Sequence, residues 1–113
     1  FGGISIIPHP EIKRTYPFGT PTKWIKENLI GLVDGIEEIS SGHGYQETYS
    51  QELGLASIGS SDDHFNLLMG TAVTAYDGNI HPDLISAVRS RQTKAITVEN
   101  SLQHLLKLAR HVF

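Results

Sequence analysis

The chain has 113 residues, 39% hydrophobic and 19% charged, a composition typical of one globular domain. Nine Lys and Arg against twelve Asp and Glu give a net charge of −3 without a basic tract, which argues against nonspecific nucleic-acid binding. The lack of cysteine excludes disulfides, thiolate zinc sites and a cysteine nucleophile, so any metal needs His, Asp or Glu ligands. The apolar runs are too short to cross a bilayer, and we expect a soluble, cytoplasmic protein with no membrane partner.

The first half of the chain predicts strands that alternate with helices. The apolar run ISIIPHP ends at two prolines that flank His9, as expected of a buried strand that leads into a loop. Ile25, Leu29 and Val33 recur every four residues and predict a helix that closes near Gly35. The other elements predicted here are a strand at 35–40, a polar helix that ends at Gly54 and a strand at 55–61.

The second half continues the same alternation. It predicts a strand at 69–76, a turn at 77–82, a helix at 82–91, a strand at 94–98 and a final helix at 101–111. Strand and helix in repeated succession favour an α/β fold with mainly parallel strands and crossover helices. We expect one domain or sub-domain over residues 1–113. Because the chain begins with Phe, almost inside a strand, we also expect it to be a piece of a longer protein.

Chemically reactive side chains follow three of the predicted strands. His9 follows the first, Glu37, Glu38 and His43 lie in or after the second, and Asp62, Asp63 and His64 follow the third. Ligands of α/β proteins bind at the carboxyl ends of the strands, so these groups are expected to converge. In an extended segment Asp62 and His64 point to one side and can share a metal. Carboxylate and imidazole without thiolate suit Zn, Mn or Fe in a catalytic site.

Each of these residues also has an ordinary structural interpretation. Asp62 could cap a helix or form a turn, and Asp63 could be a solvated acid or one that contacts the metal ligands without binding the metal. His43 lies between glycines that fit a plain loop, and Arg14, beside Lys13, fits either a phosphate contact or a solvated basic pair. Surface roles or contacts with the C-terminal dipole of a helix are expected for the histidines at a helix start and along the last helix: His81, His104 and His111.

Four segments together resemble a known family: GGISIIPHP, DGIEEIS, LASIGSSDDH followed by MGTAV, and DLISAVRSRQTKAI. Their order and spacing resemble the carboxyl-terminal half of the PHP (polymerase and histidinol phosphatase) superfamily. The most specific element is a strand-ending His-Pro followed, 53 residues after the His, by Ser-Asp-x-His. The resemblance implies a distorted (β/α)7 barrel, divalent metal ions and hydrolysis of a phosphate ester by metal-bound hydroxide. It assigns metal-ligand roles to His9, Asp62 and His64 and places Glu37 near the site.

The chain lacks the metal ligands that stand earlier in the sequences of this family. No His-x-His pair is present among the six histidines. Either the missing amino-terminal half of the barrel or an oligomeric partner supplies those ligands, or the chain is a non-catalytic remnant that packs or binds a partner. An amidohydrolase-like metal enzyme is a further alternative. The substrate of the phosphoesterase would be a phosphorylated small molecule or nucleotide, with Arg14 and His43 as phosphate contacts.

Overall fold

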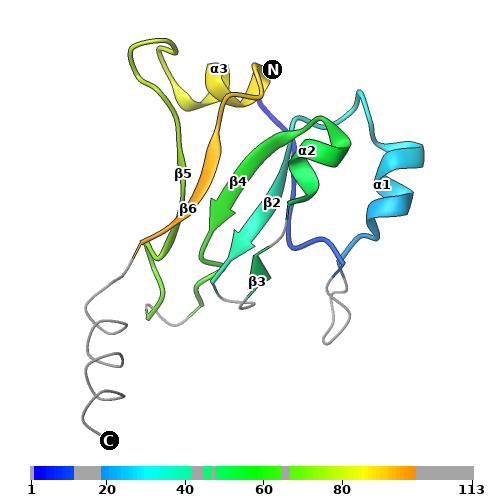
Figure 1. The fold of residues 1–113 in the computed structure, drawn as a ribbon, viewed down its shortest axis with the longest axis horizontal. Coiled ribbons are helices and arrows are strands. Elements are labelled where there is room, and N and C mark those ends of the chain that lie inside the picture. The colour runs from blue at the N-terminus through cyan, green and yellow to red at the C-terminus, as the bar shows by residue number, and fades with distance from the viewer. Residues whose placement is uncertain (1, 12–18, 42–44, 47, 65–66, 99–113) are drawn as a thin grey trace, which may run out of the picture.

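The computed structural model describes residues 2–11, 19–41, 45–46, 48–64 and 67–98. These ranges contain β1 (Ile6–Ile7), α1 (Thr22–Asn28), β2 (Gly35–Ser40), β3 (Tyr45–Gln46), α2 (Tyr49–Leu53), β4 (Ala56–Ser60), β5 (Ala72–Ala75), α3 (Leu84–Arg89) and β6 (Lys94–Thr97), as shown in Figure 1. The predicted final helix, with His104 and His111, lies outside them. Within the described part of the chain, no helix has the length and apolar character that a membrane span requires.

The larger sheet is built around β2. β1 pairs with it in parallel, with Ile6 opposite Gly35, and β4 runs parallel along its other edge, with Ser57 opposite Ile36. The short β3 pairs antiparallel with the end of β2. Three parallel strands with accompanying helices confirm the predicted α/β class. Within the described residues these strands do not close into a barrel.

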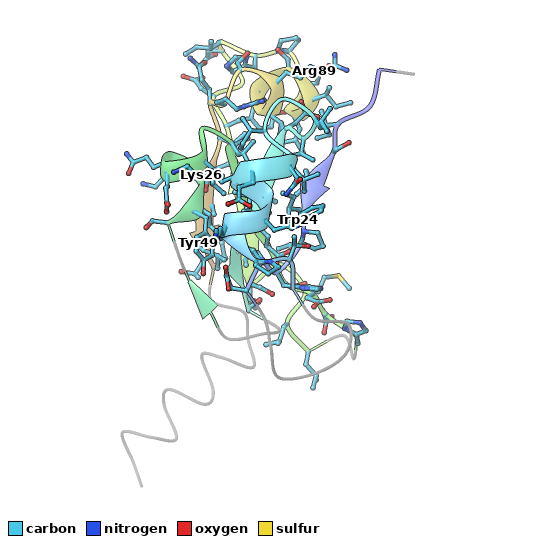
Figure 2. The ribbon with its side chains drawn as sticks, turned by 90° about the vertical axis from the view of Figure 1, so that its right-hand side faces the viewer. Trp24, Lys26, Tyr49 and Arg89 are labelled. Atoms are coloured by element: carbon cyan, nitrogen blue, oxygen red, sulfur yellow. The ribbon has the colours of Figure 1, made fainter. Side chains whose placement is uncertain are left out.

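An apolar core joins this sheet to α1 and α2. Its buried members come from β1, β2 and the two helices or their ends: Ile7, Ile25, Ile36, Leu53 and Leu55. Burial of such a side chain stabilises a fold by roughly 1.5–3 kcal/mol, so this cluster holds both helices against the sheet. Figure 2, which views the molecule from the α1 side, shows Trp24 on α1, where it is 49% exposed.

The first helix is shorter than its apolar pattern predicts. α1 ends at Asn28, although the predicted stripe continues to Val33. The chain then turns, with the Leu32 amide donating to the Leu29 carbonyl and Gly31 at a φ of 88°. A positive φ is costly for residues other than glycine, and it breaks the helical path. Leu29 and Val33 nevertheless pack against the core from this turn.

Two consecutive carboxylates of β2 lie in different surroundings, beside an irregularity in the pairing of the strand. The register shifts between Glu37, which lies opposite Ile58, and Ile39, which lies opposite Gly59. Glu38 accepts hydrogen bonds from the Ser50 amide at the start of α2 and from the Ser57 hydroxyl, at 2.5 and 3.0 Å. Glu37 is buried and only 6% exposed. Successive side chains of a strand point to opposite faces, which separates the two acids, and both accept hydrogen bonds from the protein.

The second half of the chain corrects the expectation of parallel strands. β5 and β6 pair antiparallel in a sheet of their own. The physical reason is the short connection: α3 has six residues, about 9 Å at 1.5 Å per residue, and caps the end of the pair instead of running back along it (Figure 1). Asp83 caps this helix by accepting from the Ser86 amide at 2.8 Å.

His81, for which the sequence predicts a surface role, is buried beside α3. Its side chain is 8% exposed, and its ring nitrogens lie 3.3 Å from the Ser86 hydroxyl and 2.5 Å from the Gln92 side-chain oxygen. An imidazole with both nitrogens hydrogen-bonded can be buried at little cost. The surface interpretation was wrong because sequence spacing alone does not show which loop folds over a helix start.

Threonine side chains cover the free edge of β4. The Thr74 hydroxyl pairs with both the amide and the carbonyl of Gly59, at 3.0 and 3.1 Å. The Thr93 hydroxyl donates to the Ser57 carbonyl at 2.7 Å. At Gly59 a Cβ atom would lie 2.4 Å from the Val73 carbonyl oxygen, so only glycine permits this approach. The two sheets therefore meet through side chains and one close backbone contact.

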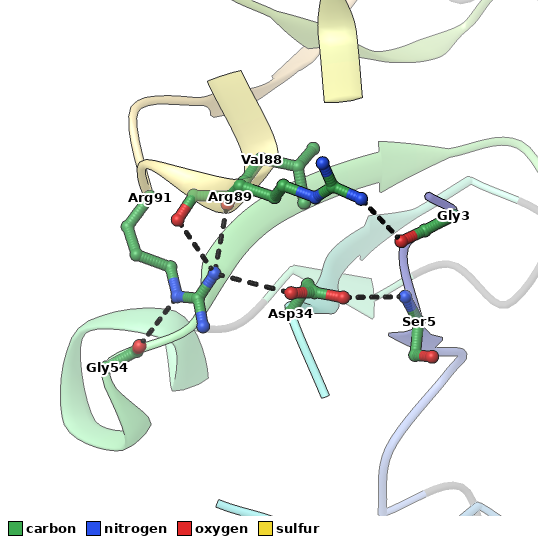
Figure 3. Close-up of polar contacts among 7 residues, drawn as sticks. All are labelled: Gly3, Ser5, Asp34, Gly54, Val88, Arg89 and Arg91. Carbon is green, nitrogen blue, oxygen red and sulfur yellow. Dashed lines mark hydrogen bonds and ion pairs between the residues drawn. The ribbon is translucent and has the colours of Figure 1, made fainter. Parts of the chain in front are cut away.

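The amino ends of the parallel strands are tied together by Arg91 and Asp34 (Figure 3). Arg91 donates to the carbonyls of Gly54, Val88 and Arg89, each at 3.2 Å, and lies 3.8 Å from the Asp34 carboxylate. The other carboxylate oxygen of Asp34 accepts from the Ser5 amide at 2.8 Å. This network, which we call the Arg91 clamp, links the segments before β1, β2, β4 and β6.

Candidate functional site

Asp62 and His64 lie side by side just beyond the carboxyl end of β4. The strand ends at Ser60, and Asp62 has a φ of 48°, so the segment is not extended as the sequence predicts. The left-handed residue instead folds His64 back, and its Nδ1 lies 2.8 Å from the Asp62 carbonyl oxygen and 3.6 Å from Asp62 Oδ1. The predicted pairing of these two side chains is therefore present, but a turn produces it.

The hydrogen bond fixes the form of the His64 ring. A carbonyl oxygen only accepts, so Nδ1 carries the hydrogen and donates it to Asp62. In the neutral ring the lone pair then resides on Nε2. The His64 side chain is 70% exposed and that of Asp62 28% exposed. The site thus presents an imidazole lone pair and a carboxylate from one short segment near the surface.

His9 follows β1, as predicted, and is half-buried at a positive φ of 22°. Positive φ at residues other than glycine is uncommon and often marks functional loops. Among the described residues, however, no three His, Asp or Glu side chains form a group that could hold a metal ion. His9 is therefore not joined to Asp62 and His64 in a three-ligand site, and its role as a ligand stays a prediction.

Glu37 supports the strand that delivers the pair. Its Oε2 accepts from the hydroxyl of Ser60, the last residue of β4, at 2.7 Å. Because Ser60 precedes Asp62 by two residues, this bond anchors the start of the loop. A buried carboxylate that orients its neighbours is consistent with the predicted place of Glu37 beside the site.

Asp63 has a role within the loop. Its Oδ1 accepts from the amides of Leu67 and Leu68, at 3.2 and 3.3 Å. The carboxylate thereby satisfies amides that would otherwise need water, in the manner of an Asp at a turn. Direct contact with a bound group is not needed to explain this residue.

The two predicted phosphate contacts, Arg14 and His43, lie outside the described residues, as does Lys13. The sequence prediction also missed two hydroxyl residues, Ser41 and Thr71, which pair at the edge of the loop. Serine and threonine are common at strand ends, so no signal in the sequence distinguished them.

One pocket of about 330 Å³ lies away from the pair, near the amino end of β4. It is lined by Ser50, Gln51, Gly54, Leu55, Ser57, Arg91 and Thr93. Several of its polar groups already bond to the protein: Arg91 to backbone carbonyls, and the Ser57 and Thr93 hydroxyls to Glu38 and the Ser57 carbonyl. These bonds serve the fold, and the loop after β4, which presents a carboxylate and an imidazole together, is the better candidate site.

Residues 46–93 match the family model described as PHP-associated. The match covers somewhat less than half of the 113 residues and contains Asp62, Asp63 and His64 but neither His9 nor Glu37. Over this stretch it confirms the predicted resemblance to a carboxyl-terminal region of the PHP superfamily. No curated protein and no solved structure matches the chain.

Proposed function

We propose that this chain carries the carboxyl-terminal part of the metal centre of a PHP-type phosphoesterase, an enzyme that hydrolyses phosphate esters. The observation that carries the proposal is the Asp62–His64 pair, with the His64 Nδ1 hydrogen bonded to a backbone carbonyl at 2.8 Å. The pair lies in the segment that matches the PHP-associated family model.

The donor chemistry of this pair fits a divalent cation. Metal-binding histidines commonly donate their second ring nitrogen to a carbonyl or carboxylate, which fixes the ring and leaves one lone pair for the ion. His64 has this arrangement, and Asp62 adds an oxygen donor from the same turn. Zn, Mn and Fe all accept imidazole and carboxylate ligands. We assign Asp62 and His64 as ligands, and a further ligand role for His9 stays a prediction because His9 does not group with them among the described residues.

The number of ligands is smaller than a catalytic site requires. Three protein ligands are typical of catalytic zinc, and the described residues contain no such group. In our proposal the remaining ligands come from an amino-terminal part of a distorted (β/α)7 barrel or from an oligomeric partner. β1 pairs only with β2 among the described strands, so its second edge can accept a further strand.

In this proposal the bound ions and the residues of the chain would have the following roles. Divalent ions, when bound, supply positive charge for the phosphate oxygens and lower the pKa of a bound water. Arg14 and His43 would orient the phosphate, Arg through a forked contact with two oxygens. Glu37 would keep Ser60, and with it the start of the ligand loop, in place. The substrate class is a phosphorylated small molecule or a nucleotide.

Elemental analysis tests the metal part of this proposal. The chain is loaded with Mn²⁺ or Zn²⁺, desalted and compared with the double variant Asp62→Ala, His64→Ala. The matched control is Asp77→Ala, because Asp77 is also an acid in a turn, where it accepts from the Asn79 amide at 2.8 Å. We expect metal in the parent chain and the control and none in the double variant. Equal metal in all three would remove Asp62 and His64 from the centre.

A second candidate is a non-catalytic PHP-like module that packs against or binds a partner. The incomplete ligand group among the described residues favours it. Phosphatase assays on the longest natural form of the protein, with p-nitrophenyl phosphate and added Mn²⁺, separate the candidates. Hydrolysis that disappears in the double variant supports the enzyme, and retained metal without hydrolysis supports the module.

A further inference from the structure

The loop that carries Asp62 and His64 begins and ends at neighbouring points of the fold. It leaves β4 after Ser60 and enters β5 at Ala72. Ser41, the residue after β2, contacts both points: its amide donates to the Ser60 carbonyl at 3.3 Å, and its hydroxyl lies 2.6 Å from Thr71 Oγ1. One residue therefore bridges the two ends of the loop.

The number of hydroxyl hydrogens determines which of the two hydroxyls donates in this contact. Thr71 has one hydroxyl hydrogen, which it donates to the Leu68 carbonyl. In the contact between the two hydroxyls, Ser41 must then be the donor and Thr71 the acceptor. Thr71 is 1% exposed, so water does not replace either bond. The result is a directed chain from Ser41 through Thr71 to the backbone of the loop.

The carbonyl at the end of this chain belongs to the turn that closes the loop. The Thr71 amide also donates to the Leu68 carbonyl, at 3.0 Å, and Gly70 between them has a φ of 77°. A glycine with positive φ at the third position is typical of a type II turn. The Leu68 amide in turn donates to Asp63, which stands between Asp62 and His64. Two further hydrogen bonds, at the carbonyl and the amide of Leu68, thus connect the hydroxyl pair to Asp63.

We infer that Ser41 and Thr71 are positioning residues, which hold the closing turn so that the Asp62 carboxylate and the His64 imidazole stay together. If Thr71 served only for packing, valine could replace it, because valine has the same shape as threonine without the hydroxyl. The expected effect on metal affinity rests on the proposed function, whereas the expected effect on the order of the loop does not. Loss of a partner bonded directly to a metal ligand typically weakens metal binding about 10- to 100-fold, and for these more distant hydroxyls we expect the lower end of that range.

The test compares Thr71→Val, Ser41→Ala and the conservative Thr71→Ser. Thr93→Val is the matched control, because it removes a threonine hydroxyl that bonds a carbonyl at 2.7 Å, near the amino end of β4. Amide hydrogen exchange at Leu67 and Leu68, the ¹⁵N shifts of the His64 ring and the Kd for Mn²⁺ are measured, with the midpoint of urea unfolding for each variant.

Thr71→Val and Ser41→Ala should speed exchange at Leu67 and Leu68 about tenfold, shift the His64 ring signals and weaken Mn²⁺ binding at least tenfold. Thr71→Ser should stay close to the parent, and Thr93→Val should lower the urea midpoint without moving the other three readouts. Unchanged exchange and ring signals in the first two variants would overturn the inference. If Thr71→Val does not fold, Ser41→Ala decides alone, since it keeps the Thr71–Leu68 bond. A parent chain without Mn²⁺ affinity would refute the metal proposal, and the exchange comparison would still decide the role of the hydroxyls.

Discussion

The two ends of the parallel sheet are built in different ways. At the amino end, the Arg91 clamp uses one guanidinium and one carboxylate to bind backbone groups of several segments. At the carboxyl end, the side chains of Asp62 and His64 lie in one short turn, which the Ser41–Thr71 hydroxyl pair and Glu37 anchor. The charged groups of the clamp bond to other parts of the fold, whereas the carboxyl end presents a carboxylate and an imidazole near the surface.

This difference favours the carboxyl end of the sheet as the proposed site. A charged group that satisfies backbone carbonyls contributes to stability and is a poor ligand for a further partner. A histidine whose Nδ1 hydrogen is bonded and whose side chain is 70% exposed can still bind through Nε2. Positive φ occurs at both ends, at Arg91 and at Asp62, so backbone strain alone does not separate them.

Gly59→Ala should have the largest effect, because Gly59 lies in the strand that both ends share. Its new Cβ would meet the Val73 carbonyl at 2.4 Å, and a backbone oxygen cannot rotate away. We expect a loss of about 3 kcal/mol in the free energy of unfolding, measured by urea denaturation. Gly78→Ala is the control, since nothing lies within 4 Å of its Cβ position, and it should change stability little. Equal stability of both variants would contradict the close approach of β5 to β4.

Arg91→Ala should remove the clamp at the amino end of the sheet and leave the carboxyl end intact. It removes the three carbonyl bonds and the contact with Asp34, at a cost of about 1–2 kcal/mol, given that the Arg91 side chain is 36% exposed. Arg91→Gly should cost about 1 kcal/mol less, because glycine accepts the φ of 58° without strain. Arg89→Ala loses one exposed bond to the Gly3 carbonyl and serves as the mild control. A stability order in which Arg91→Gly falls below Arg91→Ala would contradict the strained backbone.

Asp63→Ala should disturb the carboxyl end with a smaller effect on stability. The amides of Leu67 and Leu68 lose their acceptor, which costs about 1 kcal/mol, as for loss of a cap. Asp63→Asn retains a side-chain oxygen at the same place and should recover most of the loss. Thermal unfolding followed by circular dichroism measures both variants. An Asn variant as unstable as the Ala variant would show that the charge of Asp63, and not its acceptor oxygen, matters.

Much of the α/β core could be predicted from local patterns, and much of the pairing could not. Gly54 caps α2 with a φ of 66°, as its place after a polar helix predicts, and the strands predicted at 35–40 and 55–61 are present as β2 and β4. The antiparallel pairing of β5 and β6 depends on a six-residue helix that does not cross the sheet, and the strand pattern is the same for either direction. The Asp62–His64 pair was predicted from a spacing of two, yet a left-handed turn creates it. Ser41 and Thr71 are distant in sequence, so their pairing needs the tertiary fold.

The most direct test of the central claim is a calorimetric Mn²⁺ titration of the parent chain, Asp62→Ala and Arg91→Ala, with urea unfolding of each. The account predicts that Asp62→Ala abolishes binding at nearly unchanged stability, while Arg91→Ala lowers stability by about 1–2 kcal/mol at an unchanged Kd. Binding that survives Asp62→Ala, or that falls with Arg91→Ala while the chain remains folded, would contradict the assignment of function to the carboxyl end of the sheet.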